Sequence, residues 1–374
     1  MVVERVKNAR KAVWQSQRVM TQPHRGDSIG PFVIEKELSS GGMAFVYRAR
    51  LSTPQSGFPP HVAIKIAKLG YDDFLRDEED HLRHIHHPHI IRPIPIAPGH
   101  DEHQQKHYIR CTTKSEPPLW YLALEHLEGD SLAELLQFTR KLTPSTAIQI
   151  AEQIAMALEY LHRVRGVAHL DVRPDNILFR QDPLKYNWKP IAVLCDFGIA
   201  WHNKQIPLNS YGDLPYVAPE RRQGAPVTFA CDVYSLGIIL YEMLTGVRPY
   251  LSDEDKAIAT HAETETRDPV PPSELCHGTP QLDKVVLRAI SRNPEERYPA
   301  ISSFLEDLTL AGTEVQSQYG PQEPDSPQTL KRIIGSLLIC LIAVISFAAG
   351  VRSWNVFPPL PTVSAQITTT APIP

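Results

Sequence analysis

One short polar segment of the chain contains three residue types that could act together on a phosphate. Asp171 and Asn176 lie on either side of Arg173. A carboxylate can accept the proton of a hydroxyl group, a carboxamide oxygen can bind a magnesium ion, and a cation can lie against a moving phosphoryl group. The segment therefore predicts phosphoryl transfer. The alternative interpretation is a polar loop with ordinary capping residues.

A second acidic residue favours the phosphoryl-transfer interpretation. The sequence Leu-Cys-Asp-Phe-Gly predicts a buried strand that ends at Asp196. The two segments resemble the catalytic loop and the metal-binding Asp-Phe-Gly motif of the protein kinases. The Pro-Asp-Asn sequence in the loop is most similar to bacterial, eukaryotic-like (Hanks-type) serine/threonine kinases. By this resemblance Asp171 and Arg173 are catalytic, and Asn176 and Asp196 hold Mg²⁺ (or Mn²⁺).

Composition limits the class of protein. The chain has 374 residues, of which 42% are hydrophobic, enough for one large domain or two moderate ones. The net charge of −4 gives no indication of a nucleic-acid partner. The five cysteines form no Cys-x-x-Cys pair, which argues against a zinc site and suits a reducing compartment. The basic residues 1–27 predict an extension, either an arm on anionic lipid or, as we favour, a solvated segment.

A glycine-containing turn between two predicted strands resembles the Gly-rich loop that covers ATP phosphates. Gly41 and Gly42 would let the backbone approach phosphate oxygens. Ser39 and Ala44 stand at the first and third glycine positions of the motif, so the resemblance is partial. Further nucleotide-binding residues implied by the resemblance are Leu38, Val46, Ala63, Lys65, Glu78, Glu125 and Leu127.

Lys65 ends an apolar strand, and a buried ammonium needs a partner. By resemblance it contacts the α- and β-phosphates of ATP and is held by Glu78, with Glu79 as the alternative partner. Both acids lie on a predicted helix. Its apolar face is formed by Phe74, Leu82 and Ile85.

The strand predicted at residues 119–126 resembles the hinge that binds adenine. By this resemblance Leu124 is the gatekeeper, and the backbone from Glu125 to Leu127 supplies hydrogen bonds to adenine. The periodic helix at 145–162 then leads to the catalytic loop. The many histidines at 81–107 suggest a metal site, but we favour ordinary turn residues. Residues 98–118 predict an inserted loop.

Two departures from the family pattern concern the predicted activation segment, residues 196–220. Leu170 replaces the arginine that usually precedes the catalytic aspartate, and Asp213 replaces a threonine. A phosphate on this segment would normally pair with that arginine. We therefore expect activity to depend little on phosphorylation of Ser210 or Tyr211.

Motifs near the end of the predicted domain extend the resemblance to residues 28–311. Asp232 resembles the aspartate that supports the catalytic loop, and Arg297 is expected to pair with Glu220. Residues 312–332 predict a flexible linker.

Residues 333–351 carry no charge and would span roughly 28 Å as a helix, close to the thickness of a bilayer core. A buried core helix is the rejected alternative. Lys331 and Arg332 precede this segment, so the positive-inside rule places the kinase domain in the cytoplasm and residues 352–374 outside. The prediction is a single-pass protein of the cell membrane.

The resemblance implies an α+β, two-lobed kinase fold with a β-rich N-lobe, a helical C-lobe and one transmembrane helix. The implied reaction moves the γ-phosphoryl group of ATP to serine or threonine hydroxyls of proteins, with self-association for autophosphorylation. The partial Gly-rich loop and Leu170 leave open a membrane-tethered pseudokinase that senses nucleotide. The Ala-Pro-Glu motif disfavours a small-molecule kinase.

Overall fold

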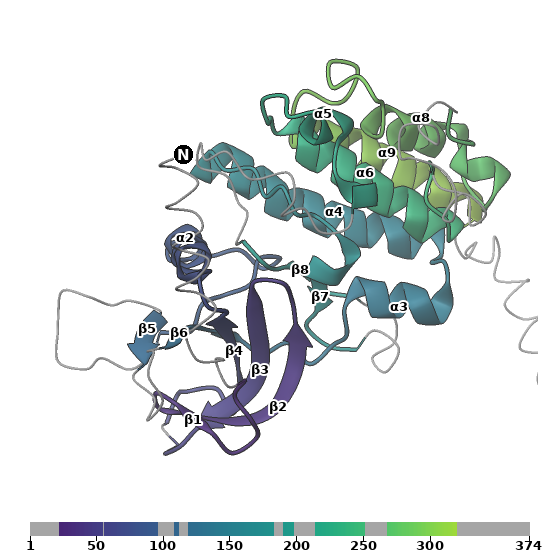
Figure 1. Ribbon diagram of the computed structural model, residues 1–374. Coiled ribbons are helices and arrows are strands. Elements are labelled where there is room, and N and C mark those ends of the chain that lie inside the picture. The colour runs from purple at the N-terminus through teal and green to yellow at the C-terminus, as the bar shows by residue number, and fades with distance from the viewer. Residues whose placement is uncertain are drawn as a thin grey trace, which may run out of the picture. The chain divides into compact units, whose positions relative to one another are not determined.

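The computed structural model describes residues 22–54, 56–95, 108–111, 119–182, 190–197, 214–250 and 268–319. They form an antiparallel sheet and a set of helices arranged as two lobes (Figure 1). The predicted two-lobed α+β fold is confirmed. Residues 1–319 make one compact unit, and residues 320–374 make a second unit that lies outside the described residues.

The N-terminal lobe contains a six-stranded sheet in which all neighbouring strands are antiparallel. Alternation along β4 buries Val62, Ile64 and Ile66 on one face, which leaves Lys65 on the other face. In order across the sheet the strands are β1 (Ser28–Ile29), β2 (Phe32–Ser40), β3 (Ala44–Leu51), β4 (Val62–Ala67), β6 (Leu119–Glu125) and β5 (Tyr108–Cys111).

The edge strand β5 corrects one sequence prediction. Residues 98–118 were expected to form a loop, but Tyr108–Cys111 pairs with β6, with Tyr108 opposite Leu122. The strand is too short for its alternation to stand out from the polar residues around it, and the free edge of β6 provides the pairing partner.

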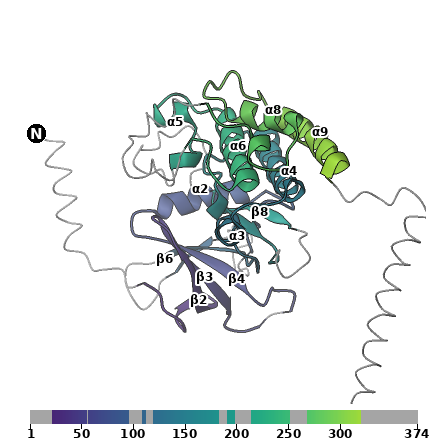
Figure 2. The ribbon, with the colours of Figure 1, turned by 90° about the vertical axis from the view of Figure 1, so that its right-hand side faces the viewer.

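Helix α2 (Asp72–Leu82) packs against β4 and β6 and lies between the sheet and the helical lobe (Figure 2). A small sheet of β7 (Ile177–Phe179) and β8 (Ala192–Leu194) flanks the catalytic segment. Backbone hydrogen bonds link this sheet to the segment after α2, because Leu194 bonds both His89 and Ile91. The two lobes are therefore joined by more than the covalent hinge.

The helical lobe is built from capped helices. Ser131 caps α3 with Glu134 in a reciprocal capping box, and Thr143 caps α4. One π-helical turn, Leu161–Arg165, follows α4 and ends at Gly166 with φ 66°. The helices are α3 (Leu132–Thr139), α4 (Pro144–Tyr160), α5 (Pro219–Arg222), α6 (Ala230–Thr245), α8 (Pro280–Ala289) and α9 (Ile301–Tyr319).

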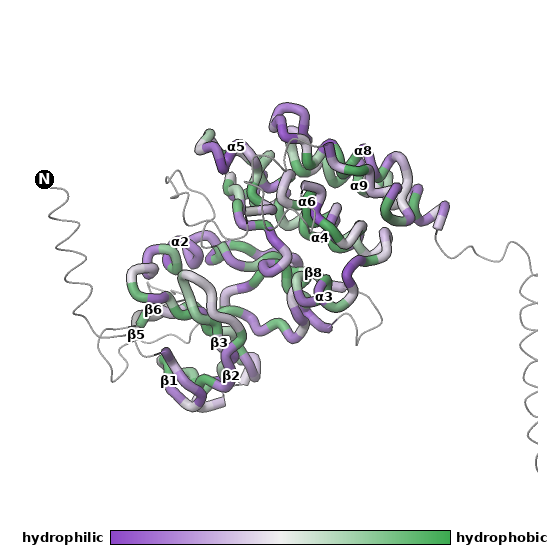
Figure 3. The backbone as a smooth tube through the Cα atoms, turned by 45° about the vertical axis from the view of Figure 1, so that its right-hand side comes forward, coloured by the Kyte–Doolittle hydropathy of each residue, from purple (hydrophilic) through white to green (hydrophobic). Residues whose placement is uncertain are grey.

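Helix α6 forms the centre of this lobe. It is buried along most of its length, and Figure 3 shows it among other hydrophobic segments. Gly237 permits close packing against α8, since a Cβ there would lie 2.8 Å from the Cβ of Ala289. Asp232, near the start of α6, is fully buried in this tightly packed part of the lobe.

Helix α9 extends the domain beyond the predicted boundary at residue 311. Val315 is buried and the helix runs to Tyr319, so the linker predicted from residue 312 begins too early. Apolar residues at helical spacing continue across this boundary, and burial of Val315 extends the helix. None of the helices in the described residues is long and apolar enough to cross a membrane. The predicted span at 333–351 lies outside those residues.

Candidate active site

Lys65 lies between two carboxylates from different parts of the chain. Its Nζ is 2.6 Å from Oε2 of Glu78, on α2, and 2.7 Å from Oδ1 of Asp196, just after β8. The backbone N–H of Phe197 donates to the other oxygen of Glu78 at 3.3 Å. Glu78 is therefore the partner of Lys65, as the sequence predicted.

The rest of α2 explains why Glu78 reaches the site. Leu75 and Leu82 are buried and fix the rotation of the helix. The alternative partner, Glu79, pairs instead with Arg83 one turn later. Phe74, predicted on the buried face, is only half-buried because Leu75 takes that position.

The charges of this cluster favour an ionised lysine. Burial alone would lower the pKa of Lys65, but the carboxylates of Asp196 and Glu78 outweigh it and raise the pKa. Burial raises the pKa of Glu78, whereas Lys65 and the Phe197 N–H act to lower it. With an ammonium 2.6 Å away, we assign Glu78 as a carboxylate.

Asp232 holds the backbone that precedes the catalytic aspartate. Its Oδ2 accepts from the N–H of His169 at 2.8 Å, and its Oδ1 accepts from the N–H of Leu170 at 2.8 Å. The ring of His162 lies 2.8 Å from Oδ2 and packs on Phe229. The role predicted for Asp232 is confirmed.

His169 links the catalytic loop to the Asp-Phe-Gly segment. Burial lowers the pKa of this histidine, so the ring is neutral. Its Nδ1 accepts from the N–H of Asp171 at 3.3 Å, which places the proton on Nε2, 3.2 Å from the carbonyl of Cys195. The ring also packs edge-on against Phe197 at 4.8 Å.

Asp171 and Asn176 are in direct contact. Nδ2 of Asn176 donates to Oδ2 of Asp171 at 2.8 Å and to its carbonyl at 2.9 Å. Burial and the nearby carboxylate of Asp196 raise the pKa of Asp171. Arg173 pairs with Asp175 at 2.9 Å, and its charge also acts on Asp171. The structure thus brings the four predicted catalytic and metal-binding residues into one region.

The Gly-rich turn leaves room for a ligand. The N–H of Gly41 donates to the carbonyl of Ala44 at 3.0 Å, which closes the turn between β2 and β3. A Cβ at Gly42 would meet nothing within 4 Å, and one at Gly41 would meet only that carbonyl at 3.8 Å. Packing within the protein therefore does not require a glycine at either position.

Glu125 occupies the hinge in a way the sequence did not indicate. Its N–H donates to the carbonyl of Arg92, so this N–H is not available to a nucleotide. Its side chain is buried and receives Nη1 of Arg180 at 2.8 Å. Leu127, two residues further along the hinge, is half-buried.

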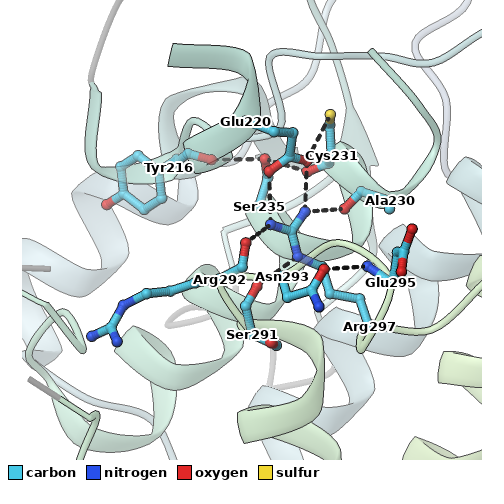
Figure 4. Close-up of polar contacts among 10 residues, drawn as sticks. All are labelled: Tyr216, Glu220, Ala230, Cys231, Ser235, Ser291, Arg292, Asn293, Glu295 and Arg297. Atoms are coloured by element: carbon cyan, nitrogen blue, oxygen red, sulfur yellow. Dashed lines mark hydrogen bonds and ion pairs between the residues drawn. The ribbon is translucent and has the colours of Figure 1, made fainter. Parts of the chain in front are cut away.

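The end of the activation segment is anchored by a bidentate ion pair. Nη1 and Nη2 of Arg297 donate to Oε1 and Oε2 of Glu220, each at 2.8 Å. Figure 4 shows this pair among its neighbours. The same guanidinium donates to the carbonyls of Ser291 and Ala230. The predicted pairing of these two residues is confirmed. Residues 198–213, with Ser210, Tyr211 and Asp213, lie outside the described part of the chain.

Within the described part of the histidine-rich segment, the rings of His87 and His89 pack against each other, with centroids 5.7 Å apart. His89 Nδ1 bonds the carbonyl of Ala192 at 2.8 Å, and burial lowers the pKa of both His87 and His89. No cluster of three potential metal-binding side chains occurs among the residues that the structure describes.

Three contacts at the site were missed from the sequence: those of His162, Arg180 and Arg221. Arg221 is buried, and its Nη1 donates to the carbonyl of Leu170. Each contact joins residues far apart in the chain, and none belongs to a local pattern. Only the double arginine at 221–222, next to the Ala-Pro-Glu motif, could have drawn notice.

A sheet lobe, a helical lobe and a lysine–glutamate–aspartate cluster next to an aspartate–asparagine pair define the protein kinase class. The family model for the protein kinase domain matches residues 32–307. The chain belongs to this family.

Curated relatives include a probable serine/threonine-protein kinase of Clostridium acetobutylicum, 31% identical over 74% of this chain and 39% of that protein. PknD of Mycobacterium tuberculosis is 33% identical over 77% of this chain and 40% of its own length. PknB of Mycolicibacterium smegmatis is 30% identical over 78% of this chain and 44% of its own length. The chain spans less than half the length of these relatives.

A crystal structure of the PknI kinase domain from Mycobacterium tuberculosis, as a double mutant, matches with a TM-score of 0.55. The two sequences are 22% identical, and the match covers 78% of this chain and 100% of the PknI chain. This similarity supports the fold.

Proposed function

We propose that the protein is a serine/threonine protein kinase that transfers the γ-phosphoryl group of ATP to protein hydroxyls. The observation that carries the proposal is the contact of one ammonium, Lys65, with both Glu78 and Asp196. This contact assembles the phosphate-binding lysine and the metal-binding aspartate in one place. The relatives described above are named serine/threonine-protein kinases, which supports the acceptor class.

The residues present fit Mg²⁺–ATP. Asp196 is partly exposed. Asn176 donates through Nδ2, so the side-chain oxygen Oδ1 of Asn176 would be its metal ligand. Two oxygen donors of this kind suit Mg²⁺ or Mn²⁺. Gly41 and Gly42 border open space for phosphates, and Leu38, Val46, Ala63 and Leu127 would contact the nucleoside. When bound, ATP supplies the phosphoryl group, and Mg²⁺ neutralises the negative charge of that group.

Each remaining role follows from the side chain and its contacts. Lys65 would bind the α- and β-phosphates while Glu78 fixes its direction. Asp171 would orient the acceptor hydroxyl and accept its proton, since it is the carboxylate at the end of the rigidly held loop. Arg173 would lie against the γ-phosphate in place of the usual lysine, with a planar guanidinium instead of a point charge.

The cheapest test is incubation of the full chain with radiolabelled ATP, Mg²⁺ or Mn²⁺ and a generic protein substrate. We expect label on serine and threonine in phosphoamino-acid analysis, both on the substrate and, through self-association, on the chain itself. Nucleotide binding without transfer in any metal would identify the alternative, a nucleotide-sensing pseudokinase. Labelling of tyrosine alone would refute the acceptor class.

We further propose that residues 28–319 form the kinase domain, and that residues 333–351 anchor it to the cell membrane with the domain in the cytoplasm. The absence of charge over residues 333–351 supports the anchor, and Lys331 and Arg332 support the orientation. The need for ATP agrees with this orientation.

A further inference from the structure

The residue before the catalytic aspartate has an unfavourable backbone conformation. Leu170 has φ 64°, in the left-handed region that residues other than glycine rarely adopt. Its side chain is 3% exposed and belongs to the main hydrophobic core. Such a conformation persists only where surrounding contacts determine it fully.

Charged groups hold the backbone on both sides of Leu170. Its N–H and that of His169 donate to Asp232, and its carbonyl accepts from Nη1 of Arg221. The same peptide plane carries the N–H of Asp171, which donates to His169. Because a peptide is planar, fixing its carbonyl and its N–H fixes where the Cα of Asp171 lies. Hydrogen bonds from a charged donor are the stronger kind.

The residue next to Arg221 is fixed by an ion pair. It lies on α5, immediately after Glu220, which Arg297 holds with two hydrogen bonds. The side chain of Arg221 is 5% exposed. A contact from this helix therefore transmits the position of the end of the activation segment to the catalytic loop.

We propose that Arg221 is a positioning residue that holds the catalytic loop through the carbonyl of Leu170, in place of a contact that depends on a phosphate. Leu170 has no charge with which to receive a phosphate, whereas Arg221 contacts the carbonyl of Leu170 without one. The kinetic part of this proposal rests on the proposed kinase function. The structural part does not.

The test compares Arg221→Met with Arg222→Met, a matched change of charge and shape at the next residue of α5. Two readouts are needed: the kcat and KM for ATP and protein substrate, and hydrogen–deuterium exchange of the backbone at residues 168–172. We expect Arg221→Met to lower kcat about 10- to 100-fold, the scale of a small misplacement of a catalytic group. Nucleotide affinity should stay within about twofold, and exchange at 168–172 should rise at least about tenfold.

Arg222→Met should leave both readouts at wild-type values, and Arg221→Lys should restore part of kcat because it keeps a charged donor. A kcat for Arg221→Met within twofold of wild type, or unchanged exchange, would overturn the proposal. If Arg221→Met does not fold, Arg221→Gln replaces it, with the same criteria. If neither folds, Arg221 is a structural residue and the proposal fails.

A separate arm examines the phosphate. The double variant Ser210→Ala, Tyr211→Phe and the phosphatase-treated wild type should keep kcat within tenfold of the untreated enzyme. A larger loss would show that a phosphate is needed to hold the loop and would refute the replacement by Arg221. If the wild type transfers no phosphate, the proposed function fails, while the exchange experiment still decides whether Arg221 fixes the loop.

Discussion

Asp171 lies where its charged form is disfavoured, although the role proposed for it requires that form. Burial and the carboxylate of Asp196 both raise its pKa, and Asn176 partly compensates with a hydrogen bond. A group whose pKa is higher in the folded chain than in the unfolded chain contributes stability below the unfolded pKa, and that stability is lost as pH rises through the folded pKa. The catalytic residue is therefore a site where stability is sacrificed for function.

Asp171→Asn should abolish phosphotransfer, preserve ATP binding and unfold at the wild-type temperature or above at neutral pH. Activity falls because the amide cannot accept a proton, and stability does not, because no charge is buried. Thermal unfolding and nucleotide titration check the variant beside the wild type. Undiminished autophosphorylation would contradict the role of Asp171.

The same shift predicts the acid limb of the pH profile. Asp171 must be ionised, so kcat/KM for ATP should fall as pH decreases through its raised pKa, with a midpoint above the ordinary aspartate value of about 3.9. Because kcat/KM reports the pKa values of the free enzyme, steady-state rates at subsaturating nucleotide give the midpoint, and circular dichroism at each pH controls for unfolding. A limb at or below the ordinary value would show that the carboxylate is better solvated than its contacts indicate.

At the residue scale, the sequence predicts what local motifs encode. Lys65, Asp171, Asn176 and Asp196 follow from spacing and resemblance, and the structure brings them together. Arg221 could not be predicted, because its partner is the carbonyl of Leu170, a group that every residue type possesses. Asp232 also contacts a distant backbone, but the family resemblance marks that residue, whereas no motif marks Arg221.

Among the elements, α5 is a very short helix that a buried ion pair links to the rest of the lobe. The side chain of Arg297 is fully buried and that of Glu220 is 12% exposed. Burial alone would raise the pKa of Glu220, but the hydrogen bonds from Arg297 outweigh it and hold the pKa below its usual range. The stabilisation is present above the unfolded pKa and is lost as pH falls through the folded value.

Arg297→Leu should destabilise the domain by about 3–5 kcal/mol, since it leaves the Glu220 carboxylate without its partner in a mostly buried position. Urea unfolding at neutral pH measures the loss. Arg297→Leu combined with Glu220→Leu should cost less than the sum of the single variants. Strict additivity of the two losses would show that the pair is not coupled.

Element prediction succeeded where periodicity was long and caps were clear. The helix predicted at 145–162 appears as α4 followed by a π-helical turn. It failed for β5, a short edge strand, and for the end of α9, where burial of Val315 extends the helix. In both cases tertiary contacts decided the outcome, and the local sequence does not contain them.

At the scale of the whole molecule, the proposed anchor makes the strongest prediction. The full chain should sediment with membranes, whereas a chain ending at Tyr319 should remain in the supernatant after cell lysis, because it lacks residues 333–351. Protease added to intact cells should spare the kinase domain. Digestion of the domain in intact cells would refute the orientation, and a soluble full chain would refute the anchor.

The lobes are also joined by an electrostatic brace. Arg180, directly after β7, donates both to Glu125 at the hinge and to the carbonyl of Pro88. We expect opening of the lobes to lengthen this ion pair. The ion pair would then oppose opening in addition to the resistance of the hinge peptide. The Arg180 side chain is 32% exposed, so dissolved salt screens the ion pair in part and weakens it without abolishing it. Where lobe opening limits turnover, ADP should leave faster as ionic strength rises, so the residence time of the spent nucleotide becomes a measure of the stiffness of the hinge.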